Sequence, residues 1–107
     1  MSKVALVTGG TRGIGAAISI ALKDAGYTVA ANFAGNEEAA AAFTAETGIK
    51  AFKWSVADYE ACAKGIAQVE EELGDISVLV NNAGITRDGM FHKLTPEKWH
   101  EAINTNL

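Results

Sequence analysis

The feature that most constrains the fold of this chain is a glycine-patterned turn between an apolar run and a helical repeat. Residues 4–7 form the apolar run VALV, and Gly9, Gly13 and Gly15 pattern the turn that follows. Isoleucine at 14 and 18 and leucine at 22 then recur every four residues, which predicts an amphipathic helix. In this context glycine lets the backbone approach a phosphate held by free N–H groups at the helix N-terminus. The sequence therefore predicts a dinucleotide-binding turn.

The rest of the chain alternates predicted strands and helices. Strands are expected at residues 4–8, 28–33, 51–55 and 76–81, and helices at residues 13–25, 37–47 and 58–73. Gly26, Gly48 and Gly74 follow the helices as stop signals, and Asp58 is expected to cap the third helix. Repeated strand–helix units imply an α/β fold with a parallel sheet and right-handed crossovers.

A fourth helix is predicted after an irregular segment. Thr95 is its expected N-cap and Pro96 its first residue, and Trp99, Ile103 and Leu107 recur every four residues. Because this pattern still runs at the last residue, we expect an N-terminal fragment of a longer protein, truncated in the fourth helix. Residues 1–107 would then form one incomplete dinucleotide-binding half-domain.

Composition excludes several classes of function. The net charge of −4 argues against binding to a nucleic-acid backbone, and no apolar run is long enough to span a membrane. The single cysteine, Cys62, excludes an internal disulfide, and its helical spacing with Ile66 and Val69 predicts a packing residue. His92 and His100 are too far apart for a helical metal site, so no metal is expected. We expect a cytoplasmic protein with no nucleic-acid or membrane partner.

Two residues bear on which dinucleotide would bind. Arg12 lies inside the glycine turn, where a guanidinium can pair bidentately with a 2′-phosphate. An acid at the end of the second strand would instead bond the ribose 2′-hydroxyl and repel that phosphate. The chain has Asn32 there and no carboxylate before Glu37. This pair favours NADPH over NADH, and the alternative is that Arg12 is a solvated loop charge.

The glycine spacing identifies a family resemblance. Thr8 followed by G-x-x-x-G-x-G resembles the glycine motif of the short-chain dehydrogenase/reductase family, and residues 81–84, NNAG, match a second motif of that family. The resemblance covers the whole chain. It implies the N-terminal half of a doubly wound Rossmann fold with a parallel sheet in the order 3-2-1-4. The fourth strand would then lie at an open edge.

The resemblance also implies a set of cofactor contacts. The family often has an acid or amide after the third strand, where this chain has Ser55, so the adenine contact is expected to fall to the Val56 backbone. The second motif would lie beside the adenosine-side ribose. The expected cofactor-binding residues are Gly9, Thr11, Arg12, Gly13, Ile14, Gly15, Asn32, Val56, Asn82, Ala83 and Gly84.

Only one residue of the family's catalytic set has a match here. Asn106, within residues 104–107 (NTNL), matches the asparagine that holds a water in a proton relay with a serine, a tyrosine and a lysine. Neither Tyr27 nor Tyr59 is followed by lysine four residues on, so we expect no turnover from these residues alone. Asp88 is expected to contact the substrate, with a turn or subunit-contact carboxylate as the alternative.

Residues 81–88, NNAGITRD, resemble the branch of the family that reduces 3-oxoacyl thioesters, and both ends of the chain resemble its members that act on acetoacetyl-CoA. This implies NADPH-dependent reduction of acetoacetyl-CoA to (R)-3-hydroxybutyryl-CoA for polyhydroxybutyrate synthesis, by a full-length homotetramer. Two alternatives stay open. One is reduction of 3-oxoacyl groups on acyl carrier protein in fatty-acid synthesis, and the other is a non-catalytic dinucleotide-binding module.

Overall fold

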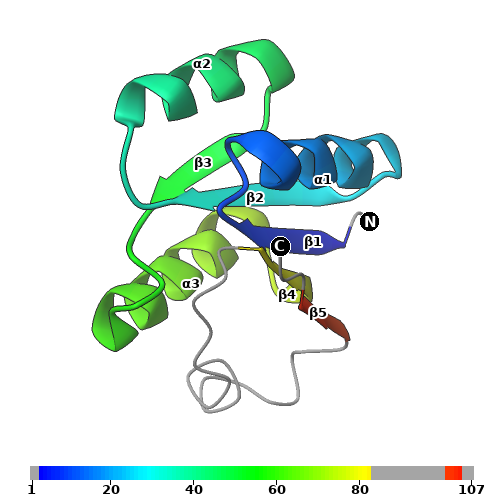
Figure 1. Ribbon diagram of the computed structural model, residues 1–107. Coiled ribbons are helices and arrows are strands. Elements are labelled where there is room, and N and C mark those ends of the chain that lie inside the picture. The colour runs from blue at the N-terminus through cyan, green and yellow to red at the C-terminus, as the bar shows by residue number, and fades with distance from the viewer. Residues whose placement is uncertain (1–2, 83–100, 105–107) are drawn as a thin grey trace.

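The computed structural model describes residues 3–82 and 101–104, and it arranges them in three layers (Figure 1). A sheet forms the middle layer, with two helices on one face and one helix on the other. The strands are β1 (Val4–Thr8), β2 (Thr28–Phe33), β3 (Lys50–Lys53), β4 (Ile76–Asn81) and β5 (Glu101–Asn104). The helices are α1 (Gly13–Asp24), α2 (Glu37–Thr47) and α3 (Tyr59–Leu73).

The strands pair in the order β3-β2-β1-β4-β5, and every pair is parallel. This confirms the predicted order 3-2-1-4 for the first four strands. In the central strand, Leu6 pairs with Ala30 of β2 on one side and with Leu79 of β4 on the other. All of β1 is buried, as expected for a parallel strand covered on both faces. The observed β1, β2, α2 and β4 have the predicted bounds, and β3 ends at Lys53 instead of residue 55.

Each face of the sheet carries its own hydrophobic core. On the face covered by α1 and α2, Val7 and Val80 of the sheet pack with Phe43 of α2. On the face covered by α3, Leu6 packs with Ile66. Neighbouring residues of β1 thus point to opposite cores, as the two-residue period of a strand requires. Burial on both faces holds the sheet in place. The candidate site lies at the carboxyl ends of its strands.

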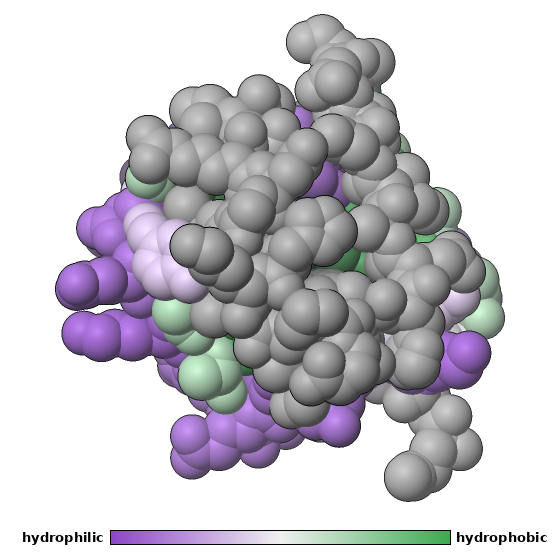
Figure 2. Space-filling view, turned by 90° about the horizontal axis from the view of Figure 1, so that it is seen from below, coloured by the Kyte–Doolittle hydropathy of each residue, from purple (hydrophilic) through white to green (hydrophobic). Residues whose placement is uncertain are grey.

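In helix α3, the apolar residues spaced three or four apart in the sequence form one buried face. Cys62 and Val69 are fully buried, whereas Glu60, Lys64 and Gln68 are exposed. Hydrophilic residues accordingly gather on the side of the molecule where α3 lies (Figure 2). Burial raises the pKa of the Cys62 thiol, so it is protonated at neutral pH. The prediction that this cysteine is a packing residue is confirmed.

Helix ends follow the predicted signals. The Asp58 carboxylate accepts a hydrogen bond from the Ala61 N–H at 3.1 Å and caps α3. Gly48 and Gly74 stand at the C-caps of α2 and α3. Within the described ranges, no helix is both long enough and apolar enough to cross a membrane.

The predicted fourth helix is wrong at Glu101–Asn104, which form β5. Ile103, part of the expected helical repeat, pairs in parallel register with Val80. The outer edge of β4 would otherwise present unpaired backbone N–H and C=O groups, and pairing with β5 satisfies them. Backbone pairing thus overrides a short helical pattern, and the expectation of an open edge at β4 is wrong for the same reason. The rest of the expected helix, residues 95–100 and 105–107, lies outside the described residues.

Candidate dinucleotide-binding site

The candidate site lies where the parallel strands end at their carboxyl edge. From β1 the chain passes to α1 on one face of the sheet, whereas β4, the other neighbour of β1, follows α3 on the opposite face (Figure 1). The connections therefore diverge between β1 and β4. Such a topological switch point is where ligands bind in open α/β sheets.

A cleft of about 500 Å³ opens between the turn after β1 and the loop after β2. Gly9, Thr11, Arg12 and Gly13 line it from the turn, and residues 33–36 line it from the loop. Arg12 is the one charged side chain among the described residues that line this cleft. The fold thus brings together four of the residues that the sequence predicted to contact a dinucleotide.

The N-terminus of α1 differs from those of the other helices in the described part of the chain. Arg12 is its N-cap and makes no capping hydrogen bond, and no acidic residue lies in the first turn. By contrast, the Asn36 side chain accepts from the Ala39 N–H at 3.0 Å in α2, and Asp58 caps α3. The first backbone N–H groups of α1 therefore remain open to an anion, which the helix dipole favours.

Gly13 and Gly15 serve this turn in different ways. Gly13 has a φ of 55°, and a Cβ there would meet no atom of the described residues within 4 Å. A Cβ on Gly15 would lie 1.9 Å from the Gly9 carbonyl oxygen, so only glycine lets α1 begin against the turn. The turn stands at a helix N-terminus without a side-chain cap, and its cation, Arg12, has no partner among the described residues, so it fits the phosphates of a dinucleotide.

Asn32 holds the turn in place from β2. Asn32 is only 2% exposed. Its Oδ1 accepts a hydrogen bond from the Gly9 N–H at 3.3 Å, and its Nδ2 donates one to the Trp54 carbonyl at 2.9 Å. Both polar ends of the amide are therefore engaged by the backbone. The sequence predicted Asn32 as a neutral cofactor-binding residue at the end of the second strand, and the structure gives its side chain a positioning role beneath the turn.

Two further hydroxyl groups, whose positioning roles the sequence did not reveal, support the turn. The Thr8 hydroxyl donates to Asn81 Oδ1 at 3.1 Å and accepts from the Asn82 N–H at 2.9 Å. Asn82 Nδ2 in turn donates to the Gly9 carbonyl at 3.3 Å, so the two sequence motifs are joined directly. Ser19 is fully buried, and its hydroxyl lies within 3.0 Å of the Gly10 and Gly15 carbonyl oxygens. The available signal for Ser19 was a polar residue within the apolar repeat of α1.

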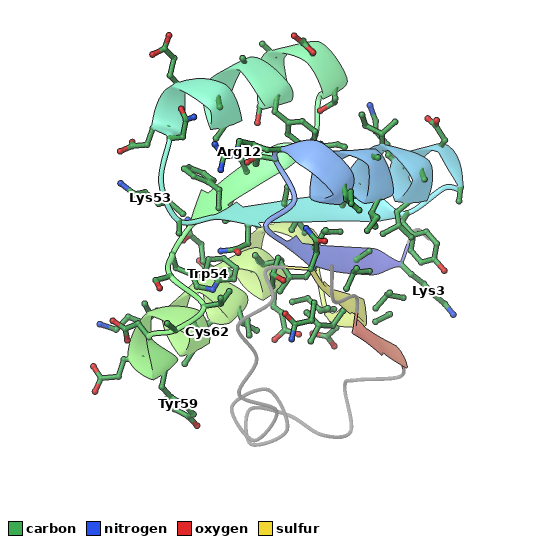
Figure 3. All side chains as sticks on the ribbon, viewed as in Figure 1. Lys3, Arg12, Lys53, Trp54, Tyr59 and Cys62 are labelled. Atoms are coloured by element: carbon green, nitrogen blue, oxygen red, sulfur yellow. The ribbon has the colours of Figure 1, made fainter. Side chains whose placement is uncertain are left out.

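The Arg12 side chain lies at the exposed start of α1. The side chain is exposed, and among the described residues it has no hydrogen-bond or ion-pair partner. Figure 3 shows it at the start of α1, with Lys53 at the end of β3. Lys53, unlike Arg12, is paired, because its Nζ lies 2.7 Å from Glu37 Oε2.

The remaining predicted residues fall into two groups. Ile14 is 51% exposed in the first turn of α1, whereas Val56 is buried in the core beneath α3, which leaves only its backbone for a ligand. Within the described ranges no cluster of histidine, cysteine or acidic residues could hold a metal ion. Four predicted residues lie outside the described residues: Ala83, Gly84, Asp88 and Asn106.

Comparison with known proteins agrees with this geometry. The sequence profile named short chain dehydrogenase matches residues 3–107. The chain is 78% identical over 107 residues to an acetoacetyl-CoA reductase of Paracoccus denitrificans. It is 43% identical over 112 aligned positions to a 3-oxoacyl-[acyl-carrier-protein] reductase of Staphylococcus aureus strain N315. Both alignments cover 100% of this chain, but only 44% and 46% of the relatives' own lengths.

A solved structure supports the fold as well. The structure of a dehydrogenase/reductase from Sinorhizobium meliloti 1021 matches with a TM-score of 0.74 at 34% identity, over 88% of this chain and 43% of that one. Sheet order and connections define a Rossmann-like α/β protein. The chain belongs to the short chain dehydrogenase family. Membership in this family implies a nicotinamide dinucleotide cofactor.

Proposed function

We propose that this chain is the dinucleotide-binding half of an NADPH-dependent reductase of 3-oxoacyl thioesters. The full-length protein would reduce acetoacetyl-CoA to (R)-3-hydroxybutyryl-CoA, which supplies polyhydroxybutyrate synthesis. The substrate follows from the 78% identity to an acetoacetyl-CoA reductase along the whole chain. The family in general implies neither this substrate nor the phosphorylated cofactor.

The observation that carries the choice of NADPH is the unpaired Arg12 guanidinium in a cleft lined by no carboxylate among the described residues. A phosphate dianion leaving water needs a fixed positive partner, and guanidinium provides two parallel N–H donors. In a dinucleotide without the 2′-phosphate, the same cation would face only a hydroxyl. The preference for NADPH therefore rests on a charge that nothing else in the described site uses.

Most of the predicted residues would contact the cofactor or substrate directly, whereas Asn32 supports the turn from beneath and the Val56 backbone would contact the adenine. Gly9, Gly13 and Gly15 admit the pyrophosphate to the first turn of α1, and Thr11 and Ile14 border it. When bound, the reduced nicotinamide supplies a hydride to the substrate carbonyl. Asn106 would hold a water in the proton relay, and Asp88 would contact the substrate where it enters. Asn82, Ala83 and Gly84 would border the adenosine-side ribose.

The proposal extends to the assembly and its place in the cell. The full-length protein would act in the cytoplasm as a homotetramer, with a soluble acyl thioester as its partner. Because the chain contains no tyrosine followed by lysine four residues on, these residues alone would not catalyse the reaction. NADPH oxidation by the purified 107-residue chain would contradict that expectation.

The test is a reductase assay on the full-length protein. Acetoacetyl-CoA is offered with NADPH or NADH, absorbance follows the loss of reduced cofactor, and chiral chromatography identifies the hydroxyacyl product. We expect turnover with NADPH and the (R) product. Higher kcat/KM with acetoacetyl groups on acyl carrier protein would favour fatty-acid synthesis. Dinucleotide binding without turnover on either thioester would favour a non-catalytic module.

A further inference from the structure

An ion pair beside the cleft has no part in the function proposed so far. Glu37 is the first residue of α2, directly after Asn36, which lines the cleft. Its Oε2 lies 2.7 Å from Nζ of Lys53, the last residue of β3. The two side chains therefore bridge from the loop after β2 to the neighbouring strand.

The location of this pair is set by the sheet. Phe33 and Lys53 are direct partners in the parallel register of β2 and β3, so Lys53 ends level with the start of the cleft loop. Only residues 34–36 separate Phe33 from Glu37. Glu37 is thus the first carboxylate that follows β2, and β3 brings a cation to it.

A carboxylate in this region has a known chemical consequence. An acid after the second strand bonds the 2′-hydroxyl of an unphosphorylated ribose and repels a 2′-phosphate. Here the hydrogen bond from Lys53, and then its charge, hold the pKa of the Glu37 carboxyl below its ordinary value. Glu37 is therefore ionised at neutral pH, and its carboxylate lies against Lys53.

We propose, building on the NADPH-dependent function above, that the Glu37–Lys53 ion pair is a second determinant of cofactor choice. Lys53 cancels the charge of Glu37 and holds its carboxylate toward β3, away from the cleft. Arg12 attracts the 2′-phosphate from one side, and Lys53 suppresses a repulsive group on the other. Without Lys53, Glu37 is free to turn toward the ribose, where it disfavours NADPH and favours NADH.

Variants of the full-length protein test this pair by direct titration of NADPH and NADH, followed by cofactor fluorescence. We expect Lys53→Met to weaken NADPH binding by about threefold to tenfold and to leave NADH binding equal or tighter. The double variant Lys53→Met/Glu37→Gln should restore the wild-type preference, because the unmasked carboxylate is gone. Lys53 and Glu37 are 51% and 72% exposed, so neither substitution removes buried packing.

The chain offers a matched control on the same strand. Lys50 of β3 pairs with Glu72 at 2.6 Å, and Glu72 belongs to α3. Lys50→Met therefore removes one positive charge and one exposed ion pair without releasing a carboxylate beside the cleft. It should leave the ratio of NADPH to NADH affinity unchanged.

A second control distinguishes the specific release of the Glu37 carboxylate from a general change in net charge. Glu38 also lies in the first turn of α2, and Glu38→Gln added to Lys53→Met should not restore the preference. Equal rescue by Glu38→Gln, or an unchanged preference in Lys53→Met, would overturn the inference. So would a loss in Lys53→Met that Glu37→Gln fails to rescue, because Lys53 would then bind the phosphate directly. A wild-type protein that prefers NADH would instead contradict the proposed function, and the inference with it.

Discussion

The cleft is bordered by two connections that are built in opposite ways. The turn after β1 is held by buried groups, because Asn32 accepts a hydrogen bond from the Gly9 N–H and the Ser19 hydroxyl bonds the Gly10 carbonyl. The loop after β2 is exposed, and its ion pair, Glu37 with Lys53, lies largely in solvent. Buried polar groups are costly to leave unpaired, whereas exposed pairs contribute little to stability. The buried bonds of the first connection therefore fix the shape of the site, whereas the exposed Arg12 and the exposed ion pair of the second connection would adjust which ligand it prefers.

The largest expected effect follows from Gly15→Ala in the buried turn. The new Cβ would lie 1.9 Å from the Gly9 carbonyl oxygen and 2.6 Å from Asn82 Nδ2, so the turn must shift. We expect the free energy of unfolding of the full-length protein to fall by about 3 kcal/mol. NADPH binding should be lost in the same titration.

Gly35→Ala provides the control from the exposed loop. A Cβ on Gly35 would meet no atom of the described residues within 4 Å, so this variant should unfold at the wild-type urea concentration. Equal stability of the two alanine variants would break the comparison between the turn and the loop.

Replacing Asn32 by leucine tests the buried hydrogen bonds without emptying the space. The Gly9 N–H and the Trp54 carbonyl would lose their side-chain partner. We expect a loss of about 2 kcal/mol in the free energy of unfolding and faster hydrogen exchange at the Gly9 amide. An unchanged exchange rate at Gly9 would show that the turn holds its shape without Asn32.

Arg12→Gln should change preference without changing stability. Its side chain is exposed and makes no pair among the described residues, so the urea midpoint should stay at the wild-type value. NADPH binding should weaken by about tenfold to a hundredfold, while NADH binding stays the same. An equal loss for both dinucleotides would mean that Arg12 contacts the pyrophosphate and not the 2′-phosphate.

The smallest effect is the pH dependence of the exposed ion pairs. Hydrogen bonds from Lys53 and Lys50 hold the pKa values of Glu37 and Glu72 below the ordinary 4.5. A carboxyl whose pKa is lower in the folded state stabilises the fold at pH values above its unfolded-state pKa. This stabilisation is lost as the pH falls through its folded-state pKa. The variant Glu37→Gln/Glu72→Gln should therefore unfold slightly earlier than wild type in urea at neutral pH. That difference should shrink as the pH falls below 4.5 through the lowered pKa values of the two carboxyls, and a difference that does not change with pH would contradict the pairing.

Whether a structural feature could be predicted from the sequence depends on how far apart in the chain its interacting residues lie. The bounds of β1 and α2 followed from local patterns, because apolar runs and caps are read within one element. The cleft residues Gly9, Arg12 and Gly13 also followed, since glycine spacing reflects backbone geometry inside one turn.

What the sequence did not reveal depends on pairing across the sheet. Glu101–Asn104 form a strand because they pair with the edge of β4. The spacing of apolar residues within this segment carries no information about that edge. The same holds for the Asn32 bonds to Gly9 and Trp54, and for the pairing of Glu37 with Lys53. Each joins residues far apart in the chain, and no local pattern encodes them.

The most direct test of the central claim is a crystal structure of the full-length protein with NADP⁺ bound. The account predicts the 2′-phosphate in the cleft between residues 9–13 and 33–36, within about 2.9 Å of the Arg12 guanidinium. It also predicts that Glu37 stays on Lys53. A 2′-phosphate turned toward solvent, with Arg12 unpaired, would contradict the account.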